Sequence, residues 1–255
     1  MSISKNLEYQ NWIRKNRQDP DPKLRLFCFP YAGGGASLFR LWQEHLPREI
    51  EVCPVQLPGR ESRIKEPLFE ELDPLLEILS EVLLPTLGTP FAFFGHSLGA
   101  LIAFELSRRL RKMNNLMPAQ IIVAACPAPH LPETHSPIHE LPREEFIRSL
   151  REMDGTPEAV FMDPELIDFF LPLLRADFKI YETYQYQPEE PLSCPISAYG
   201  GLRDESVTPD ATQAWETQTS ASFVRRMFPG NHYFLKENNS YLFKAILDDL
   251  VSFLE

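Results

Sequence analysis

The sequence predicts an α/β fold, with a mostly parallel central sheet, helices on both faces and an inserted helical lid. Three observations lead to this prediction. Short apolar runs alternate with helical patterns, Gly or Pro residues end those runs, and one long proline-rich interval breaks the alternation. Parallel strands are buried on both faces, so they read as continuous apolar runs with covering helices between them.

Six short apolar runs are predicted to form the strands. They lie at 24–29 (LRLFCF), 52–57 (VCPVQL), 91–95 (FAFFG), 121–126 (IIVAAC), 196–200 (ISAYG) and 223–228 (FVRRMF). Between them the helical patterns fall at 38–46, 74–84, 98–112, 209–218 and 240–254. This order predicts one sheet whose strands are joined by crossover helices.

The interval from about 127 to 193 contains helical patterns but no convincing strand. One helix is expected at 143–153, and a longer one begins at Asp163, a capping residue that precedes Pro164 in the first turn. Apolar residues recur at helical spacing in the second helix, at Leu166, Phe169, Phe170, Leu173 and Phe178. We expect a lid over one end of the sheet that lines an acyl pocket; an ordinary packing layer is the alternative.

Length and charge restrict the class of protein. A chain of 255 residues suits one hydrophobic core, so we expect residues 1–255 to form a single domain. Twenty-five basic and 36 acidic side chains give a net charge of −11, which repels nucleic acid. The polar first 23 residues and the lack of any long apolar stretch predict a cytoplasmic protein without membrane contact, which we expect to be a monomer.

Cysteine and histidine spacing predicts no metal site. His135 and His139 have the spacing of a helical metal site, but Pro137 between them argues against a helix. The cysteines form no C-x-x-C pair and are expected to be reduced core residues. They are Cys28, Cys53, Cys126 and Cys194.

A candidate nucleophile lies in the segment FAFFGHSLGALIAFEL, at 91–106. A predicted strand runs through Gly95-His96-Ser97-Leu98-Gly99 directly into a helix, which is the setting of a nucleophile elbow. Ser97 would then project beyond the carboxyl end of a central strand. The amide of Leu98 would lie at the helix start and could stabilise developing negative charge. We expect His96 to support the turn.

A serine nucleophile needs a base and a group that orients the base, in the chain order serine, acid, histidine. Asp204 follows a predicted strand after a Gly-Gly turn and is the candidate acid. Asp210 is the reserve, disfavoured because it falls in the first turn of the next helix. His232 in FPGNHYF follows the last predicted strand and is the candidate base. The histidines that this order excludes are His45, His130, His135 and His139.

The glycine-rich segment PYAGGGAS follows the first predicted strand. We expect a backbone amide near Ala32 to point toward Ser97 as a second oxyanion donor. Phosphate binding is the alternative use of such a loop. The G-K-[ST] ending of a P-loop is missing, and no acidic residue lies at the dinucleotide-binding distance in a suitable setting.

Six blocks of the sequence, in order and spacing, resemble the type II thioesterases that accompany nonribosomal peptide and polyketide synthetases. The match runs from about Leu24 to Leu250, and LPGRESR and LPLLRADF distinguish this group from general esterases and lipases. The blocks are FCFPYAGGGAS, VQLPGRESR, FAFFGHSLGALIAFEL, LPLLRADF, YGGLRDESV and FPGNHYFL.

This resemblance implies an α/β-hydrolase fold and hydrolysis of acyl or aminoacyl thioesters on the phosphopantetheine arm of carrier protein domains, without a metal or soluble cofactor. Ser97, Asp204 and His232 fall in the triad positions of the family. The amides of Ala32 and Leu98 fall in the oxyanion hole. Two other functions stay open: a serine esterase or acyltransferase acting on small free esters, and a non-catalytic binding module.

Two residues depart from the family's pattern. Leu98 stands where methionine is frequent, an exchange that leaves the backbone amide unchanged. Asn231 replaces the glycine that often precedes the histidine, and asparagine tolerates a left-handed backbone, so we expect the loop to be kept. Arg60 and Arg63 of LPGRESR are expected to be structural.

Overall fold

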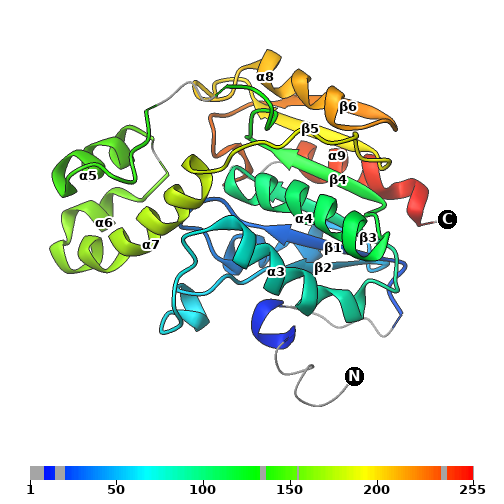
Figure 1. Ribbon diagram of the computed structural model, residues 1–255, viewed down its shortest axis with the longest axis horizontal. Coiled ribbons are helices and arrows are strands. Elements are labelled where there is room, and N and C mark those ends of the chain that lie inside the picture. Colours follow the sequence, from blue (N-terminus) through cyan, green and yellow to red (C-terminus); the bar gives the residue numbers. More distant parts are fainter. Residues whose placement is uncertain (1–8, 15–20, 133–135, 154, 237–239, 255) are drawn as a thin grey trace.

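The computed structural model describes residues 9–14, 21–132, 136–153, 155–236 and 240–254, and its centre is a six-stranded parallel sheet. The strand order is β2-β1-β3-β4-β5-β6, so β3 lies inside the sheet and β2 and β6 form its edges (Figure 1). The strands are β1 (Leu24–Phe29), β2 (Ile50–Pro54), β3 (Phe91–His96), β4 (Gln120–Ala124), β5 (Ile196–Gly201) and β6 (Phe223–Phe228). All six predicted strands and the α/β class are confirmed.

The predicted helices are also present, with shifted ends. The pattern at 38–46 divides into two short helices, and the one at 209–218 does the same. One short helix between Pro157 and Asp163 was not predicted. The α-helices are α2 (Trp42–His45), α3 (Leu72–Leu83), α4 (Leu98–Asn114), α5 (Arg143–Glu152), α6 (Glu158–Met162), α7 (Pro164–Glu182), α8 (Pro209–Gln213) and α9 (Ser240–Leu250).

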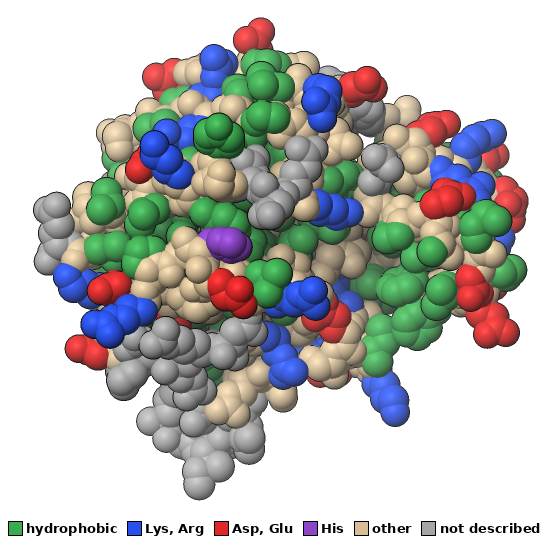
Figure 2. Space-filling model, turned by 180° about the vertical axis from the view of Figure 1, so that it is seen from behind, with side chains coloured by type: hydrophobic (Ala, Val, Ile, Leu, Met, Phe, Trp, Pro, Cys, Tyr) green, Lys and Arg blue, Asp and Glu red, His purple; other side chains and the backbone are tan. Residues whose placement is uncertain are grey.

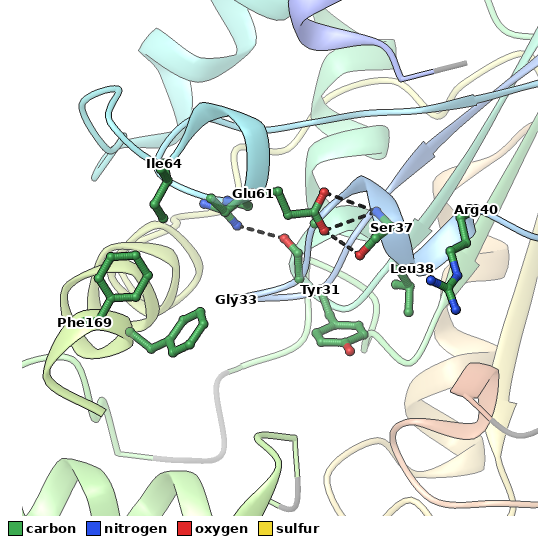
Figure 3. Close-up of a pocket in the computed structure, with 12 residues that line it drawn as sticks. Tyr31, Gly33, Ser37, Leu38, Arg40, Glu61, Ile64 and Phe169 are labelled. Atoms are coloured by element: carbon green, nitrogen blue, oxygen red, sulfur yellow. Dashed lines mark hydrogen bonds between the residues drawn. The ribbon is translucent and has the colours of Figure 1, made fainter. Parts of the chain in front are cut away.

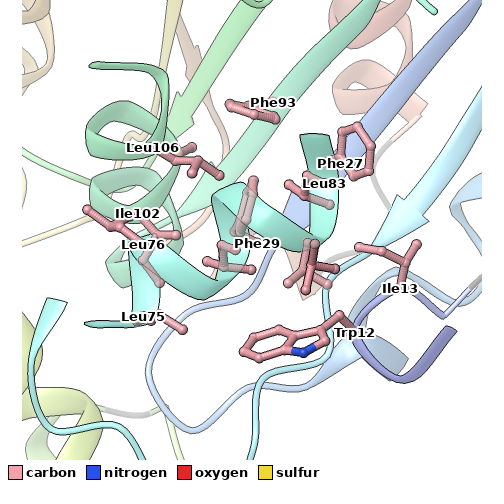
Figure 4. Close-up of a cluster of buried hydrophobic side chains, with 14 of the residues drawn as sticks. Trp12, Ile13, Phe27, Phe29, Leu75, Leu76, Leu83, Phe93, Ile102 and Leu106 are labelled. Atoms are coloured by element: carbon pink, nitrogen blue, oxygen red, sulfur yellow. The ribbon is translucent and has the colours of Figure 1, made fainter. Parts of the chain in front are cut away.

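Helices α3 and α4 cover one face of the sheet. Their apolar residues pack on alternate residues of β1 and β3, because successive side chains of a strand point to opposite faces (Figure 4). Phe27, Phe29 and Phe93 stand on this face, where the Phe93 ring makes edge-to-face contacts with the other two. Trp12 and Ile13, from the start of the chain, close the cluster at its far side (Figure 4).

Helices α2 and α9 cover the other face. Leu26, Cys28 and Phe94 of the central strands pack there against Trp42 and Ile246, all of them buried. Burial on both faces explains why these strands are apolar throughout. The edge strand β6 differs, because five of its six residues are only partly buried or exposed.

The segment between β4 and β5 contributes α5, α6 and α7, which lie together at one end of the sheet (Figure 1). These helices share a small apolar cluster of their own. Asp163 caps α7 as predicted, since its carboxylate accepts the amides of Glu165 and Leu166. Met162, Leu166 and Phe169 stay exposed, and Figure 2 shows hydrophobic side chains gathered on this part of the surface.

The four cysteines are free and buried. In the described ranges, no cluster of three or more His, Cys, Asp or Glu side chains is placed to hold a metal ion. No helix within those ranges is long and apolar enough to cross a membrane.

Candidate active site

Ser97 lies at the sharp turn between β3 and α4. Its φ of 53° and ψ of −117° are unusual for a residue with a side chain, and backbone strain of this kind gathers at functional sites. The glycines on either side are required for close approach. A Cβ on Gly95 would lie 2.1 Å from the carbonyl oxygen of Gly99, and one on Gly99 would lie 2.1 Å from that of Phe29.

The backbone of Ser97 is anchored to the neighbouring strand. Its amide donates to the carbonyl oxygen of Ala124 at 2.8 Å, and its own carbonyl accepts the amide of Ala100 at 2.8 Å. The side chain is partly exposed. Leu98 is the first residue of α4, so its amide has no partner within the helix.

Asp204 and His232 are brought together from loops that follow β5 and β6. His232 Nδ1 lies 2.9 Å from Asp204 Oδ2. The other carboxylate oxygen, Oδ1, accepts the hydroxyl of Ser206 at 2.7 Å and the amides of Ser206 and Val207 at 2.9 and 3.1 Å. The side chain of Asp204 is 1% exposed and that of His232 is 21% exposed. The carboxylate is therefore fixed, while the imidazole reaches the surface of the site.

These contacts set the charge of Asp204. Burial opposes its ionisation, but the hydrogen bonds and charge of His232 and the hydrogen bonds of Ser206 outweigh burial, and the pKa of Asp204 lies below its usual value. An ionised Asp204 holds the proton of His232 on Nδ1. Nε2 is then left as the acceptor, as a general base requires.

His96 forms part of the wall behind His232. Its ring is fully buried and lies 5.5 Å from the His232 ring and 5.6 Å from the Tyr31 ring, in edge-to-face contacts. Burial and the nearby His232 hold the pKa of His96 well below its usual value. A neutral His96 fits the predicted role of supporting the turn. Burial also raises the pKa of Tyr31 to about 12, so its hydroxyl stays protonated.

The loop after β1 is held by three side chains from two other segments. Asp177 accepts the amide of Gly33 at 2.7 Å, and Gln56 Oε1 accepts that of Ala36 at 3.1 Å. Glu61 Oε1 accepts the amide of Ser37 at 3.2 Å. Because two of these three amides already bind carboxylates, the loop is poorly suited to hold a phosphate, the alternative left open by its glycines.

The loop before His232 keeps its turn, but not because Asn231 adopts a left-handed backbone, as was expected. The residue with a left-handed φ is Gly230, at 123°, and Asn231 is not among the positive-φ residues of the described chain. Asn231 instead accepts the amide of Tyr233 on its side-chain oxygen at 2.9 Å. This local turn bond is one that aspartate and asparagine favour.

The remaining candidates lie elsewhere. Asp210 is in the first turn of α8, as expected. His130 contacts Gln218, and His139 contacts Glu182 on α7 through Nδ1 at 2.6 Å. His45 stacks on a phenylalanine of α9, and His135 lies outside the described residues.

A cavity of about 670 Å³ opens between the loop after β1 and helix α7. Leu38, Ile64, Phe169 and Phe170 give it apolar walls, and Tyr31 lies beside the glycines of the loop (Figure 3). Phe169 and Phe170, two of the apolar residues predicted for the lid, thus face a cavity. Ser97, Asp204 and His232 are not among its lining residues.

Sequence reasoning missed several side chains around these residues. Ser206, which bonds to Asp204, lies in the block YGGLRDESV, where a serine two residues after an aspartate was a usable signal. Gln56 and Glu61 lie in VQLPGRESR, and Asp177 in LPLLRADF. Arg60, which was expected to be structural, has a buried guanidinium in contact with Asp177.

Comparison with known proteins gives the family. Residues 24–252 match the thioesterase domain family. The chain is 46% identical to the gramicidin S biosynthesis protein GrsT of Aneurinibacillus migulanus, over 91% of this chain and 90% of that protein. It is 45% identical to a protein of Brevibacillus parabrevis named linear gramicidin dehydrogenase LgrE, over 95% of this chain and 94% of that one.

Solved structures agree. The type II thioesterase BorB from the borrelidin biosynthetic cluster superposes with a TM-score of 0.83 at 35% identity, covering 94% of this chain and 96% of that chain. The predicted α/β-hydrolase fold and the predicted family are both confirmed. The chain belongs to the thioesterase family, among the type II thioesterases of nonribosomal peptide and polyketide systems, and is an enzyme that hydrolyses thioesters.

Proposed function

We propose that the protein removes acyl or aminoacyl groups from the phosphopantetheine arm of carrier protein domains, with Ser97, His232 and Asp204 as its catalytic triad. The observation that carries this proposal is the buried, ionised Asp204, which is bonded to His232 Nδ1. This pair follows the carboxyl ends of β5 and β6, and Ser97 stands in a strained turn at the carboxyl end of β3. In a carrier-based pathway, this reaction would remove stalled or wrong acyl groups or release products.

In the acylation step, the hydroxyl oxygen of Ser97 attacks the thioester carbon while His232 Nε2 takes the hydroxyl proton. The negative charge that develops on the carbonyl oxygen is stabilised by the amides of Ala32 and Leu98. Collapse of the tetrahedral intermediate breaks the carbon–sulfur bond. The proton on His232 passes to the departing pantetheine thiolate, which leaves an ester on Ser97.

In the deacylation step, His232 removes a proton from a water molecule that attacks the ester carbon. A second tetrahedral intermediate collapses, the proton returns to Ser97, and the free acid leaves. Asp204 keeps its charge throughout and stabilises the imidazolium of His232. The reaction as proposed uses no metal or soluble cofactor.

Apo structures often lack a tight hydrogen bond between nucleophile and base, which forms only when substrate binds. The hydrogen bonds of Ser97 within the described chain are made by its backbone. In the proposed mechanism, the hydrogen bond between the Ser97 hydroxyl and His232 Nε2 forms when substrate binds. Substrate enters beside α7, where the apolar wall of the cavity suits an acyl chain.

The experiment compares an acyl-pantetheine carrier protein with an oxygen ester of the same acyl group, using the wild type and Ser97→Ala. We expect faster turnover of the carrier-bound thioester and loss of nearly all activity in Ser97→Ala. Equal or faster turnover of the oxygen ester would favour the esterase alternative. Undiminished hydrolysis by Ser97→Ala would show that Ser97 is not the nucleophile.

A second assay defines the substrate. Acetyl, longer acyl and aminoacyl carriers are mixed in equal amounts, and intact-mass spectrometry of the carrier shows which loads disappear first. The absence of hydrolysis with every load would leave the protein as a binding module and would refute the proposed reaction.

A further inference from the structure

A buried ion pair joins the inserted helix α7 to the LPGRESR segment. Arg60 Nη1 lies 2.7 Å from Asp177 Oδ2, and Arg60 Nη2 lies 2.8 Å from Asp177 Oδ1. The two side chains are 6% and 2% exposed. A buried, two-bond contact between a guanidinium and a carboxylate fixes both groups in distance and in plane.

The same pair also holds the loop after β1. Asp177 Oδ2 accepts the amide of Gly33, the residue after Ala32, and Arg60 Nη1 donates to the carbonyl oxygen of Gly34 at 3.2 Å. Helix α7 touches the loop directly as well. A Cβ on Gly33 would lie 2.5 Å from Leu174, a residue of α7. The side chain of Leu174 therefore packs directly against the backbone of Gly33.

Other side chains hold the far end of the loop independently of α7. Glu61 accepts the amide and the hydroxyl of Ser37 (Figure 3). Gln56 accepts the amide of Ala36. Glu61 and Gln56 belong to the segment after β2, on the body of the fold. Among the described residues, Asp177 and Leu174 of the inserted helices contact the beginning of the loop, next to Ala32.

We propose that Asp177 and Arg60 are positioning residues that set the Ala32 oxyanion donor, so that the oxyanion hole is complete only when α7 is docked on the loop. This inference rests on the proposed function, because it concerns the donor that the proposed mechanism uses. A donor stabilises the transition state only when it points at the oxyanion from hydrogen-bonding distance. Moving α7 away would break the bonds to Gly33 and Arg60 together and release the residue beside the donor.

The pair has a chemical consequence for the reaction. Ground-state binding of the acyl chain uses the apolar cavity walls and does not need the oxyanion donor. A loss of positioning should therefore lower kcat and leave KM almost unchanged. If the pair served only to hold the fold together, its replacement would lower the stability of the protein. The enzyme molecules that remain folded would then keep the wild-type kcat.

The main test uses Asp177→Asn, which keeps the size of the side chain and removes its charge. We expect kcat for a carrier-bound acyl thioester to fall about 10- to 100-fold, less than the roughly 100- to 1,000-fold loss on removing an oxyanion donor outright, with KM changed less than about threefold. The matched control is Asp168→Asn on the same helix, which removes an exposed ion pair with Arg143. Its kcat should equal that of the wild type.

A second readout separates the transition state from the ground state. An acyl trifluoromethyl ketone forms a tetrahedral adduct on a serine, whereas a thioether analogue of the substrate only binds. Asp177→Asn should lose affinity for the ketone by the same factor as kcat and keep its affinity for the thioether. Equal losses for both inhibitors would overturn the inference.

A double variant, Arg60→Leu with Asp177→Leu, controls for misfolding. Replacing a whole buried ion pair by apolar residues often leaves stability unchanged, so its melting temperature should lie close to that of the wild type. We expect kcat to stay low. A double variant with wild-type kcat would overturn the inference and leave the proposed function intact, whereas a wild type without Ser97-dependent hydrolysis would refute the proposed function and this inference with it.

Discussion

At the scale of single residues, His96 shows how the site controls charge. A charged imidazole at this position would lie fully buried beside His232, which is the candidate base. Its lowered pKa keeps it neutral, so it does not repel the imidazolium that forms on His232 during the reaction. His96, which was expected to support the turn, therefore also keeps a second positive charge away from His232.

A pH prediction follows from His96. Unfolded His96 takes up a proton near pH 6.5, whereas folded His96 does so only at a much lower pH. Below pH 6.5 the unfolded state binds more protons, so the free energy of unfolding falls as the pH falls, by up to about 1.4 kcal/mol per unit for this group. Urea unfolding at pH 7.5, 6.5 and 5.5 measures this change in the free energy of unfolding.

His96→Phe keeps an aromatic ring in the same contacts but cannot take up the proton. We expect its stability to fall less between pH 6.5 and 5.5 than that of the wild type, by about 1 kcal/mol. His45→Gln changes an exposed histidine and should keep the wild-type pH dependence. Identical curves for His96→Phe and the wild type would contradict the assignment.

At the scale of elements, the junction of β3 and α4 depends on two close backbone contacts. Gly99→Ala would place a methyl group against the carbonyl oxygens of Phe29 and Pro30, at 2.1 and 2.7 Å, where no flexible side chain can move away. Strand β1 and helix α4 would have to separate. We expect a loss of at least about 1 to 3 kcal/mol in the free energy of unfolding and a lower rate of hydrolysis.

The matched control is Gly88→Ala, in an exposed turn where a Cβ meets no atom within 4 Å. Its stability should stay within about 0.5 kcal/mol of the wild type. Chemical denaturation compares both variants at one pH. Equal stability of Gly99→Ala and Gly88→Ala would show that the elbow is looser than the structure indicates.

The elements that the sequence predicted correctly share one property. Strands β1, β3 and β4 lie inside a sheet covered on both faces, so nearly every residue had to be apolar, and the runs were visible without an alignment. Helix α6 was missed because it has five residues between Pro157 and Pro164, too few to show a helical period.

The candidate site could be predicted only in part, for a related reason. Each triad candidate follows a predicted strand: Ser97, Asp204 and His232. Parallel strands all have their carboxyl ends on the same side of the sheet, so residues that follow them can meet there. The pair of Arg60 and Asp177 gave no such signal, because the two residues are 117 positions apart and Asp177 lies within a helix of the inserted segment. Sequence spacing alone says nothing about contacts across a fold.

At the scale of the whole molecule, the net charge of −11 affects the encounter with a carrier domain. An acidic carrier would be repelled at long range, and salt would screen that repulsion. We expect kcat/KM for an acidic acyl-carrier substrate to rise between about 20 and 200 mM salt. The uncharged N-acetylcysteamine thioester of the same acyl group should show no such rise.

A fall in kcat/KM with salt for the carrier substrate would contradict this expectation. It would mean that a local basic patch steers the carrier more strongly than the total charge repels it. Stopped-flow or quenched-flow rates at subsaturating carrier give kcat/KM directly and measure both substrates under the same conditions.

The central claim is that the acyl group passes through an ester on Ser97, with His232 as the base. The most direct measurement is rapid quenching of the enzyme with an acyl thioester, followed by digestion and mass spectrometry of the peptide that contains Ser97. We predict that this peptide gains the mass of the acyl group in the wild type and that His232→Ala forms the adduct much more slowly. An acyl group found on another residue, or hydrolysis that continues at the wild-type rate in Ser97→Ala, would contradict the account.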